Sequence, residues 1–186
     1  MNMRHLLNSV PTSISSASGL KRRLKQIGFG LLAAWGFLPT FAGHRVIVIN
    51  TSPSVAPGLY IRWGIEPAVG QIIDFRIPER ARLYVQKRTV QDCDDWYILK
   101  PIAAGPGDRI DTTGSSLVIN GCAIAPMPPD FDSAGRTLPL WRENCVLGPD
   151  EFFVFSARIP NSFDSRCYGP VHRQQIDSVR RALITW

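Results

Sequence analysis

Apolar residues in this chain gather in short runs that glycine, proline and asparagine separate. Runs that alternate apolar and polar positions, or that are apolar throughout, are typical of β-strands. Because no long amphipathic helical pattern accompanies them, the sequence predicts an all-β soluble domain. The expected strands are Val46–Asn50, Leu59–Trp63, Gln71–Arg76, Leu83–Val90, Trp96–Lys100, Arg109–Asp111, Leu117–Ile119, Glu151–Ser156 and Val179–Trp186.

Turn-forming residues predict how several strands connect. Gly64–Gly70 is expected to be a loop, and a hairpin is expected around Thr113-Gly114-Ser115. Asn120-Gly121 is a strong signal for a further hairpin turn, because both residues tolerate a positive φ. Pro126–Pro139 is rich in proline and is expected to be a loop with little structure of its own.

The N-terminal part of the chain differs from the rest. Residues 1–26 contain five basic residues and no acidic residue, show no sustained periodicity, and are expected to be a disordered tail. Ile27–Gly43 is uncharged and mostly apolar, at the short end of what a membrane-spanning helix needs. Three interpretations remain open: a single transmembrane anchor, a cleaved signal peptide that ends at Thr40-Phe41-Ala42, or a buried core helix.

The net charge of +6 is located almost entirely in this tail. Beyond residue 26 the 16 basic and 15 acidic residues nearly balance, so the expected domain carries no basic footprint for nucleic acid. A basic cluster just before an apolar segment indicates membrane topology instead. We therefore expect residues 1–26 in the cytoplasm, residues 27–43 in the membrane and residues 44–186 outside.

Two serines and a lysine are the first candidates for chemistry. Ser52 and Ser54 lie in a turn that Pro53, Pro57 and a glycine make rigid, so the turn can present a hydroxyl. Lys100 ends an apolar strand, where desolvation would lower its pKa and make it a general base. The alternatives are a polar turn after a membrane anchor and a strand-end lysine that reaches solvent.

Three motifs in this chain resemble those of the type I signal peptidases, and they occur in the same order. This family consists of serine proteases with a Ser/Lys dyad. It has Ser-x-Ser-x-x-Pro-x-Leu around the nucleophile, which residues 52–59 match. It has Asn-Ser-x-Asp-Ser-Arg-x-x-Gly near its end, which residues 161–169 match.

The third motif surrounds the lysine. The family has Tyr-Ile-x-Lys-Arg followed by Gly-x-Pro-Gly-Asp. This chain has Tyr97, Ile98 and Lys100, then Gly105-Pro106-Gly107-Asp108, with Pro101 in place of the arginine. The resemblance covers residues 27–186.

Further details are similar to the TraF-type conjugative transfer peptidases. This subfamily has Ser-x-Pro-x-Gly-Leu-Tyr, Gly-Arg-x-Leu-Pro-x-Trp and Ser-Phe-Asp-Ser-Arg, which match residues 54–60, 135–141 and 162–166 with one departure, Ala56 in place of proline. Ser156–Pro160 stands where the housekeeping enzymes have Gly-Asp-Asn-Arg-Asp.

The resemblance implies a mainly β, antiparallel, signal-peptidase-like (LexA-like) domain behind one N-terminal transmembrane helix. Ser54 would be the nucleophile, neutral Lys100 the general base, and the Ser54 N–H and Ser52 hydroxyl the oxyanion donors. Ser162 would hydrogen-bond Lys100, and Asp164 and Arg166 would form a supporting ion pair. From the residues alone, Asp164 and Arg166 predict only a surface ion pair.

The implied activity is processing of a pilin precursor for conjugative transfer, with possible cyclisation of the product. The implied partners are this propilin and the lipid bilayer, without a cofactor. The implied place is the bacterial inner membrane, with the N-terminus cytoplasmic and the peptidase domain periplasmic.

Rival functions remain. A Ser-His-Asp triad would have to use His172, since His5 lies in the tail and His44 at the membrane edge. A general type I signal peptidase and a non-enzymatic β-domain component of a secretion channel also stay open. A LexA-type self-cleaving repressor would need a helix-turn-helix pattern, which the sequence lacks.

The four cysteines are scattered and form no metal-ligand spacing. In an oxidising periplasm a disulfide between Cys122 and Cys145 would close a ring around the proline-rich segment. The resemblance makes no prediction for Cys93 and Cys167, which lie near the motifs.

Overall fold

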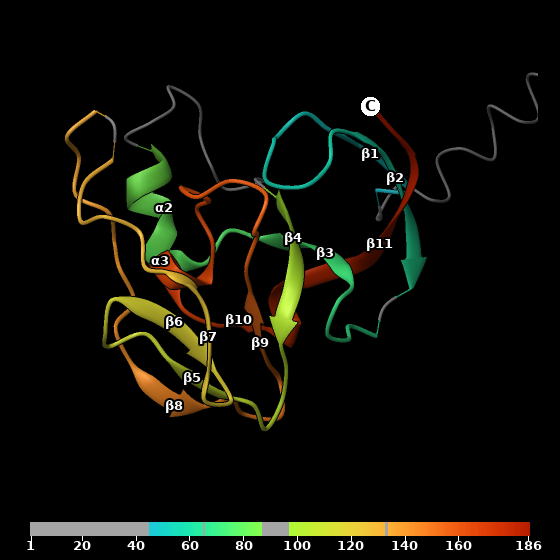
Figure 1. The fold of residues 1–186 in the computed structure, drawn as a ribbon. Coiled ribbons are helices and arrows are strands. Elements are labelled where there is room, and N and C mark those ends of the chain that lie inside the picture. Colours follow the sequence, from blue (N-terminus) through green and yellow to red (C-terminus); the bar gives the residue numbers. More distant parts are fainter. Residues whose placement is uncertain (1–44, 65, 87–96, 133) are drawn as a thin grey trace, which may run out of the picture. The chain divides into compact units, whose positions relative to one another are not determined.

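The structure is a computed structural model that describes residues 45–64, 66–86, 97–132 and 134–186. Two antiparallel sheets dominate this part of the chain (Figure 1). The strands are β1 (Ile47–Asn50), β2 (Gly58–Gly64), β3 (Ile72–Arg76), β4 (Tyr97–Ala104), β5 (Arg109–Asp111), β6 (Ser116–Ile119), β7 (Cys122–Pro126), β8 (Asn144–Val146), β9 (Glu151–Val154), β10 (Val171–His172) and β11 (Ile176–Thr185). The helices are α2 (Glu79–Gln86), α3 (Ser165–Tyr168) and the 3-10 helix η2 (Arg173–Gln175).

The larger sheet has the strand order β1-β2-β11-β3-β4-β9-β10. Its C-terminal strand β11 lies between β2 and β3 and pairs with both. A fully buried ion pair ties this strand to β3, since Arg180 Nη2 lies 2.5 Å from the carboxylate of Asp74. Ser178 adds a 2.7 Å hydrogen bond to the same carboxylate. The last strand of the chain therefore joins the two halves of the sheet.

The smaller sheet has the order β7-β6-β5-β8 and confirms both expected hairpins. At the second hairpin, Asn120 and Gly121 have φ values of 51° and 80°, the two positive values that a type I′ turn needs. The segment Pro126–Pro139 forms the expected loop, with an isolated bridge between Phe131 and Thr137.

The expected strand Leu83–Val90 is wrong in its described part, because residues 79–86 form α2. Ala81, Tyr84 and Val85 are buried and lie at helical spacing, whereas Leu83 points outward with 71% of its surface exposed. Tertiary burial of one helical face has overridden the β propensity of Leu-Tyr-Val. Residues 87–90 lie outside the described residues.

The expected disulfide between Cys122 and Cys145 is also wrong, since both thiols are free. Cys122 begins β7 and Cys145 lies in β8, the two opposite edges of the smaller sheet. Three strand spacings of about 4.8 Å separate these edges, so the Cα atoms are about 14 Å apart in the plane of the sheet. A disulfide needs Cα atoms within about 7 Å.

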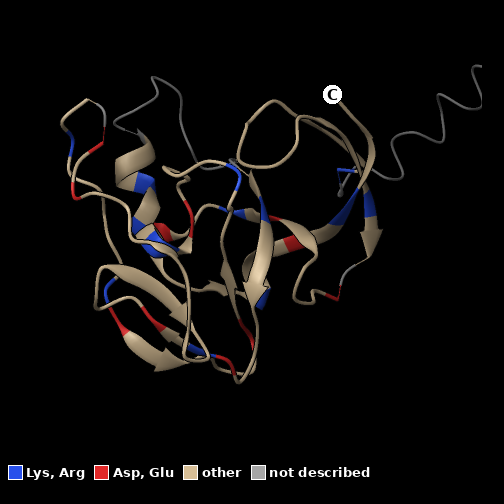
Figure 2. Ribbon diagram, in the orientation of Figure 1, with Lys and Arg blue, Asp and Glu red and all other residues tan. Residues whose placement is uncertain are grey.

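The expected tail and apolar segment, residues 1–43, lie outside the described residues, as do Cys93 and Trp96. Within the described residues no helix is long and apolar enough to cross a membrane. Basic and acidic residues are interspersed along the described ribbon (Figure 2). The prediction of a mainly β, antiparallel domain is confirmed.

Candidate active site

The turn between β1 and β2 carries Ser52 and Ser54, and Asn50 organises it from within. The Asn50 amide donates to the carbonyls of Ser52 (3.0 Å), Val55 (3.0 Å) and Ala56 (3.1 Å). Its own carbonyl oxygen accepts the Ser52 N–H at 3.1 Å. One buried side chain thus satisfies four backbone groups and fixes the backbone on both sides of Ser54.

Two residues that follow β9 hold the same turn from outside. The Ser156 hydroxyl donates a short hydrogen bond to the Ser54 carbonyl, and Arg158 Nε donates to the Pro53 carbonyl at 3.2 Å. Both belong to the segment that differs from the housekeeping signal peptidases. In this chain that segment therefore supports the serine turn through contacts more than 100 residues apart.

The C-terminal strand closes the turn on its third side. A Cβ atom on Gly58 would lie 2.2 Å from the Ile184 carbonyl oxygen, so only glycine permits this close approach. Trp186 N–H also donates to the Pro57 carbonyl at 3.1 Å. Ser54 is consequently only 4% exposed, whereas residues 51–53 of the same turn are exposed.

Lys100 lies in the middle of β4, opposite Ile73 of β3. Its side chain is 3% exposed, which excludes the interpretation of a strand-end lysine that reaches solvent. Burial lowers the pKa of Lys100 to about 8, and the nearby Asp164 carboxylate partly opposes this shift. Lys100 Nζ donates to Ser162 Oγ at 2.9 Å, which confirms the expected hydrogen bond.

Residues next to the serine and the lysine pack on one another. Val55 and Leu99 belong to one small hydrophobic cluster with Tyr60. Because Val55 follows Ser54 and Leu99 precedes Lys100, burial of this apolar cluster draws the two polar residues toward one site. The Tyr60 hydroxyl also donates to the Ala56 carbonyl at 2.7 Å, which anchors the cluster to the turn.

Ser52, Ser54 and Lys100 line one cleft with a volume of about 860 Å³. The two serine hydroxyls lie 3.1 Å apart, and either can be the donor. The cleft also has an apolar lining, which extends from the serine turn to α2 and β4 and comprises Val48, Ile49, Ile77, Val85, Ile98 and Leu99. An apolar wall beside paired hydroxyls is typical of a binding site in which few polar groups fix the orientation of a largely apolar ligand.

Asp164 and Arg166 form a bidentate ion pair, with Nε–Oδ1 and Nη2–Oδ2 distances of 2.9 Å. Their side chains are 0% and 2% exposed, so the prediction of a surface ion pair is wrong. Asp164 is the N-cap of α3, and the short helix that follows turns the Arg166 guanidinium back onto the carboxylate. The pair also reaches Ser162, because Arg166 Nη2 donates to the Ser162 carbonyl at 3.3 Å.

Asp164 also supports the serine turn, because its Oδ2 accepts the Ser156 N–H at 3.4 Å. The ion pair therefore supports both Ser162 beside the lysine and Ser156 beside the serine turn.

His172 lies on β10, at the opposite end of the sheet order from β1, with a 60% exposed side chain beside Glu151. It does not line the cleft, so the structure gives no support to a triad that uses this histidine. Within the described residues no group of three or more His, Cys, Asp and Glu side chains could hold a metal ion.

Residues 20–186 match the family model described as signal peptidase, peptidase S26. The chain belongs to the signal peptidase S26 family. This family is one of serine peptidases, and the resemblance to type I signal peptidases is thereby confirmed.

Relatives of this S26 family member include two kinds of protein. A plasmid transfer protein TraF from Escherichia coli is 32% identical over 90% of this chain and 100% of its own length, and a second TraF from the same species is 30% identical. A signal peptidase I from Leptolyngbya laminosa is 28% identical over 90% of this chain and 79% of its own. The crystal structure of a signal peptidase I from Enterococcus faecalis covers 61% of this chain and 96% of its own, with 19% identity and a TM-score of 0.36.

The motifs of this S26 family member single out Ser52, Ser54, Lys100 and Ser162. The structure brings the first three together in one cleft and places Ser162 against the lysine. Sequence reasoning missed Asn50, Ser156 and Arg158, which hold the serine turn. A signal existed only for Asn50, since asparagine before a turn often hydrogen-bonds nearby backbone groups. The roles of Ser156 and Arg158 depend on long-range contacts, which no local pattern reveals.

Proposed function

We propose that this chain is a membrane-anchored serine endopeptidase that uses Ser54 as nucleophile and Lys100 as general base. The observation that carries the proposal is the buried lysine. A lysine with a pKa of about 8, hydrogen-bonded to Ser162 and lining one cleft with Ser54, is neutral often enough near neutral pH to accept a proton. Membership of a serine peptidase family supports the same assignment.

In the first half-reaction Ser54 Oγ attacks the scissile carbonyl carbon while Lys100 Nζ takes the hydroxyl proton. The resulting oxyanion receives hydrogen bonds from the Ser54 N–H and from the Ser52 hydroxyl, which lies 3.1 Å from Ser54 Oγ in the resting site. The tetrahedral intermediate then collapses, and the leaving amine takes the proton from Lys100. An ester between Ser54 and the acyl part of the substrate remains.

In the second half-reaction Lys100 Nζ takes a proton from the attacking group, which adds to the ester carbonyl. The ester bond to Ser54 then breaks, and Lys100 returns the proton to Ser54 Oγ. Water as the attacking group gives a linear product. The α-amine of the same polypeptide would give a cyclic product, and the new peptide bond would replace the one that was cleaved. Ser162 keeps the lysine directed at Ser54 in both halves, and the Asp164–Arg166 pair holds Ser162 in place.

The proposed substrate is a membrane-inserted pilin precursor of a conjugation apparatus. The support is the similarity to two plasmid transfer proteins along nearly the whole chain, together with the subfamily motifs at residues 54–60, 135–141 and 162–166. The proposed place of cleavage is the periplasmic side of the bacterial inner membrane, with residues 27–43 as anchor. The five basic residues before residue 27 support this topology.

The test is co-expression of the full chain with a propilin, followed by mass spectrometry of the product. Ser54→Ala and Lys100→Met should each abolish cleavage, and the double variant should be no worse than either single variant, because the pair acts as a unit. Ser115→Ala, at an exposed serine outside the cleft, serves as the matched control. A cyclic product would be lighter than the linear one by one water molecule.

Normal cleavage by either Ser54→Ala or Lys100→Met would refute the dyad. Cleavage of unrelated secretory precursors as fast as the propilin would favour a general signal peptidase. A precursor that stays intact with the unaltered chain would favour the non-enzymatic channel component.

A further inference from the structure

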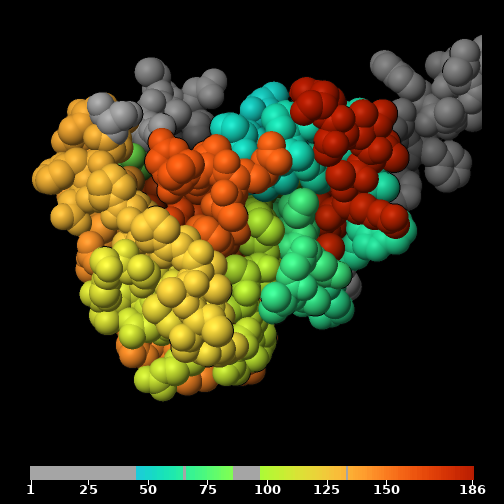
Figure 3. Space-filling model, viewed as in Figure 1, coloured from blue at the N-terminus to red at the C-terminus, as the bar shows by residue number. Residues whose placement is uncertain are grey.

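A second cavity, with a volume of about 340 Å³, lies beside the catalytic cleft. Its wall combines rings and an aliphatic side chain with polar groups, and it is contributed by α2, the proline-rich segment, the loop before α3 and α3 itself. The polar members are Asp132, Asn161, Ser162 and Cys167. We call this cavity the proline pocket, and it is defined by Tyr84, Pro128, Pro129, Phe131, Leu138 and Phe163. The proline-rich segment (amber) and the loop that contains Phe163 (orange) lie side by side on the face shown in Figure 3. The mechanism above does not use this cavity.

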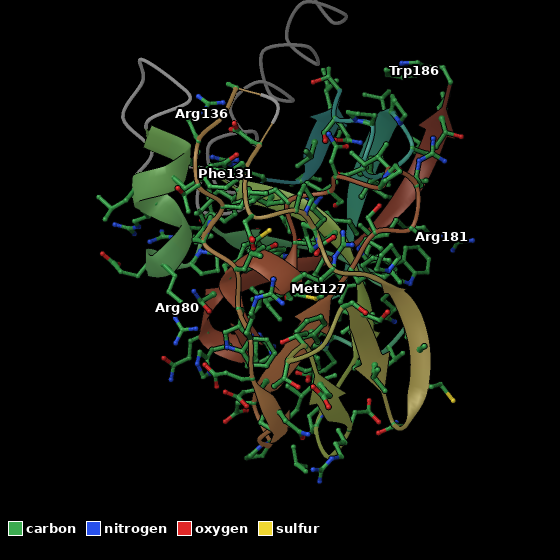
Figure 4. The ribbon with its side chains drawn as sticks, turned by 60° about the vertical axis from the view of Figure 1, so that its left-hand side comes forward. Arg80, Met127, Phe131, Arg136, Arg181 and Trp186 are labelled. Atoms are coloured by element: carbon green, nitrogen blue, oxygen red, sulfur yellow. The ribbon has the colours of Figure 1, made fainter. Side chains whose placement is uncertain are left out.

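Hydrogen bonds fix the rim of the proline pocket. The Asp132 carboxylate accepts the N–H groups of Ala134 and Arg136 at 2.9 Å and Arg136 Nε at 2.8 Å. It also accepts the Tyr84 hydroxyl at 2.8 Å, which ties the loop to α2. The ring of Tyr84 stacks on Phe163 with a centroid distance of 5.0 Å. Phe131 and Arg136 project from the loop next to α2 in Figure 4. The pocket is therefore preformed by the loop.

The proline pocket adjoins the proposed dyad. Asn161 and Phe163 line both the pocket and the cleft. Ser162 lies between them in the sequence, lines the pocket, and accepts the hydrogen bond from Lys100 Nζ at 2.9 Å. The two cavities are therefore adjacent, which places the second one within reach of the residues that flank a bond bound at Ser54.

The lining selects the kind of side chain that fits. The Asp132 carboxylate stays ionised, because hydrogen bonds, first of all from the Arg136 backbone, hold its pKa far below the usual range. Arg136 Nε lies 2.8 Å from Asp132 Oδ2 and already compensates this negative charge. A cationic guest side chain would therefore lose its hydration without gaining a new ion pair. An aromatic guest would gain ring contacts with Tyr84, Phe131 and Phe163 in addition to its buried area.

We propose that the proline pocket is a specificity site that binds one aromatic side chain of the polypeptide substrate, beyond the segment held in the cleft. This inference rests on the proposed peptidase function, since it names a further feature of the same substrate. Phe131 is a specificity-determining residue in this proposal, because it lines the pocket and 58% of its surface is exposed and available to a guest ring.

The experiment uses the full chain in detergent and a panel of internally quenched peptides that differ at one residue, which is Phe, Leu, Ala or Lys. That residue is placed in turn at each position after the cleaved bond. At one position kcat/KM for Phe should exceed that for Ala on the order of tenfold, and Lys should rank with Ala. Phe131→Ala should remove this preference, while Trp63→Ala should keep it. Trp63 is a matched control, because it is 60% exposed and lines neither cavity.

A second measurement separates failure of this inference from failure of the proposed function. Ser54→Ala labelled with ¹³C at leucine methyl groups should show saturable shifts of Leu138 with the Phe peptide and much smaller shifts with the Ala peptide. If no peptide is cleaved but these shifts occur, the peptidase function fails and the aromatic site stands. If peptides are cleaved without a Phe preference, or if Trp63→Ala and Phe131→Ala act alike, the aromatic site is refuted.

Discussion

Lowering the pH of the cleavage reaction should protonate Lys100 and stop it from acting as a base. Burial is the main cause of the lowered pKa of about 8, whereas an exposed lysine titrates at 10.5. Only the neutral amine can take the Ser54 proton, so activity should be present above the pKa and should disappear as the pH falls through it. The neutral fraction is about one half at pH 8, about one tenth at pH 7 and about one hundredth at pH 6.

The assay is kcat/KM for one peptide substrate between pH 6 and pH 10 at constant ionic strength, because this parameter reports the free enzyme. We expect kcat/KM to fall tenfold per pH unit below the Lys100 pKa of about 8 and to reach a plateau above about pH 9. We call this pH-dependent part of the profile the acidic limb. A flat profile between pH 6 and pH 9 would refute Lys100 as the base. A value of kcat/KM that still rises tenfold per pH unit up to pH 10 would instead contradict the effect of burial.

Asp164→Asn tests the cause of the shift. The Asp164 carboxylate raises the pKa of Lys100, so its loss should move the limb to lower pH. Arg166, left without its partner, pushes the lysine pKa in the same direction. Breaking this buried pair also costs about 3–5 kcal/mol, so thermal unfolding must be followed in parallel. Asp130→Asn, at an exposed ion pair with Arg142, is the control that should leave the limb in place; an upward shift in Asp164→Asn would refute the reasoning.

Three further predictions concern the serine turn and the thiols. Ser52→Ala should lower kcat by roughly 10²–10³ with little change in KM, as measured by steady-state kinetics; a raised KM alone would make Ser52 a turn residue. Asn50→Ala should destabilise the domain by about 2–4 kcal/mol in urea unfolding, because backbone groups lose their partner; an unchanged midpoint would contradict its role. Without reductant, iodoacetamide should modify exposed Cys122 and spare buried Cys167, as mass spectrometry can show; a disulfide between Cys122 and Cys145 would contradict the sheet order.

The sequence was sufficient where structure depends on neighbouring residues. Short apolar runs located β2, β3 and β9 to within two residues at each end, and Asn120-Gly121 located a hairpin turn. The motifs also indicated which polar residues would meet, since Lys100 and Ser162 form the expected hydrogen bond.

The sequence was insufficient where contacts with distant parts of the chain determine the local structure or the burial of a side chain. Leu83-Tyr84-Val85 has strand propensity, and only the core beneath α2 selects a helix. Nothing near Asp164 shows that its ion pair will be buried, because the segments that cover it come from elsewhere in the chain. Arg166 Nη1, for example, donates to the Pro126 carbonyl at 2.8 Å, 40 residues away.

The position of β11 in the sheet has a consequence for when the enzyme can become active during its own synthesis. The serine turn belongs to the β1–β2 hairpin and Lys100 to the β3–β4 pair, and β11 is the strand that joins these two units. Chains are made from the N-terminus, so both units leave the ribosome long before residues 176–185 exist. The pairing of β11 with β2 also spans more than 100 residues, which makes it a slow step of folding. If Ser54 and Lys100 act as proposed, their two units are fully joined only once residues 176–185 are available, so we expect proteolytic activity to appear late, after β11 has paired.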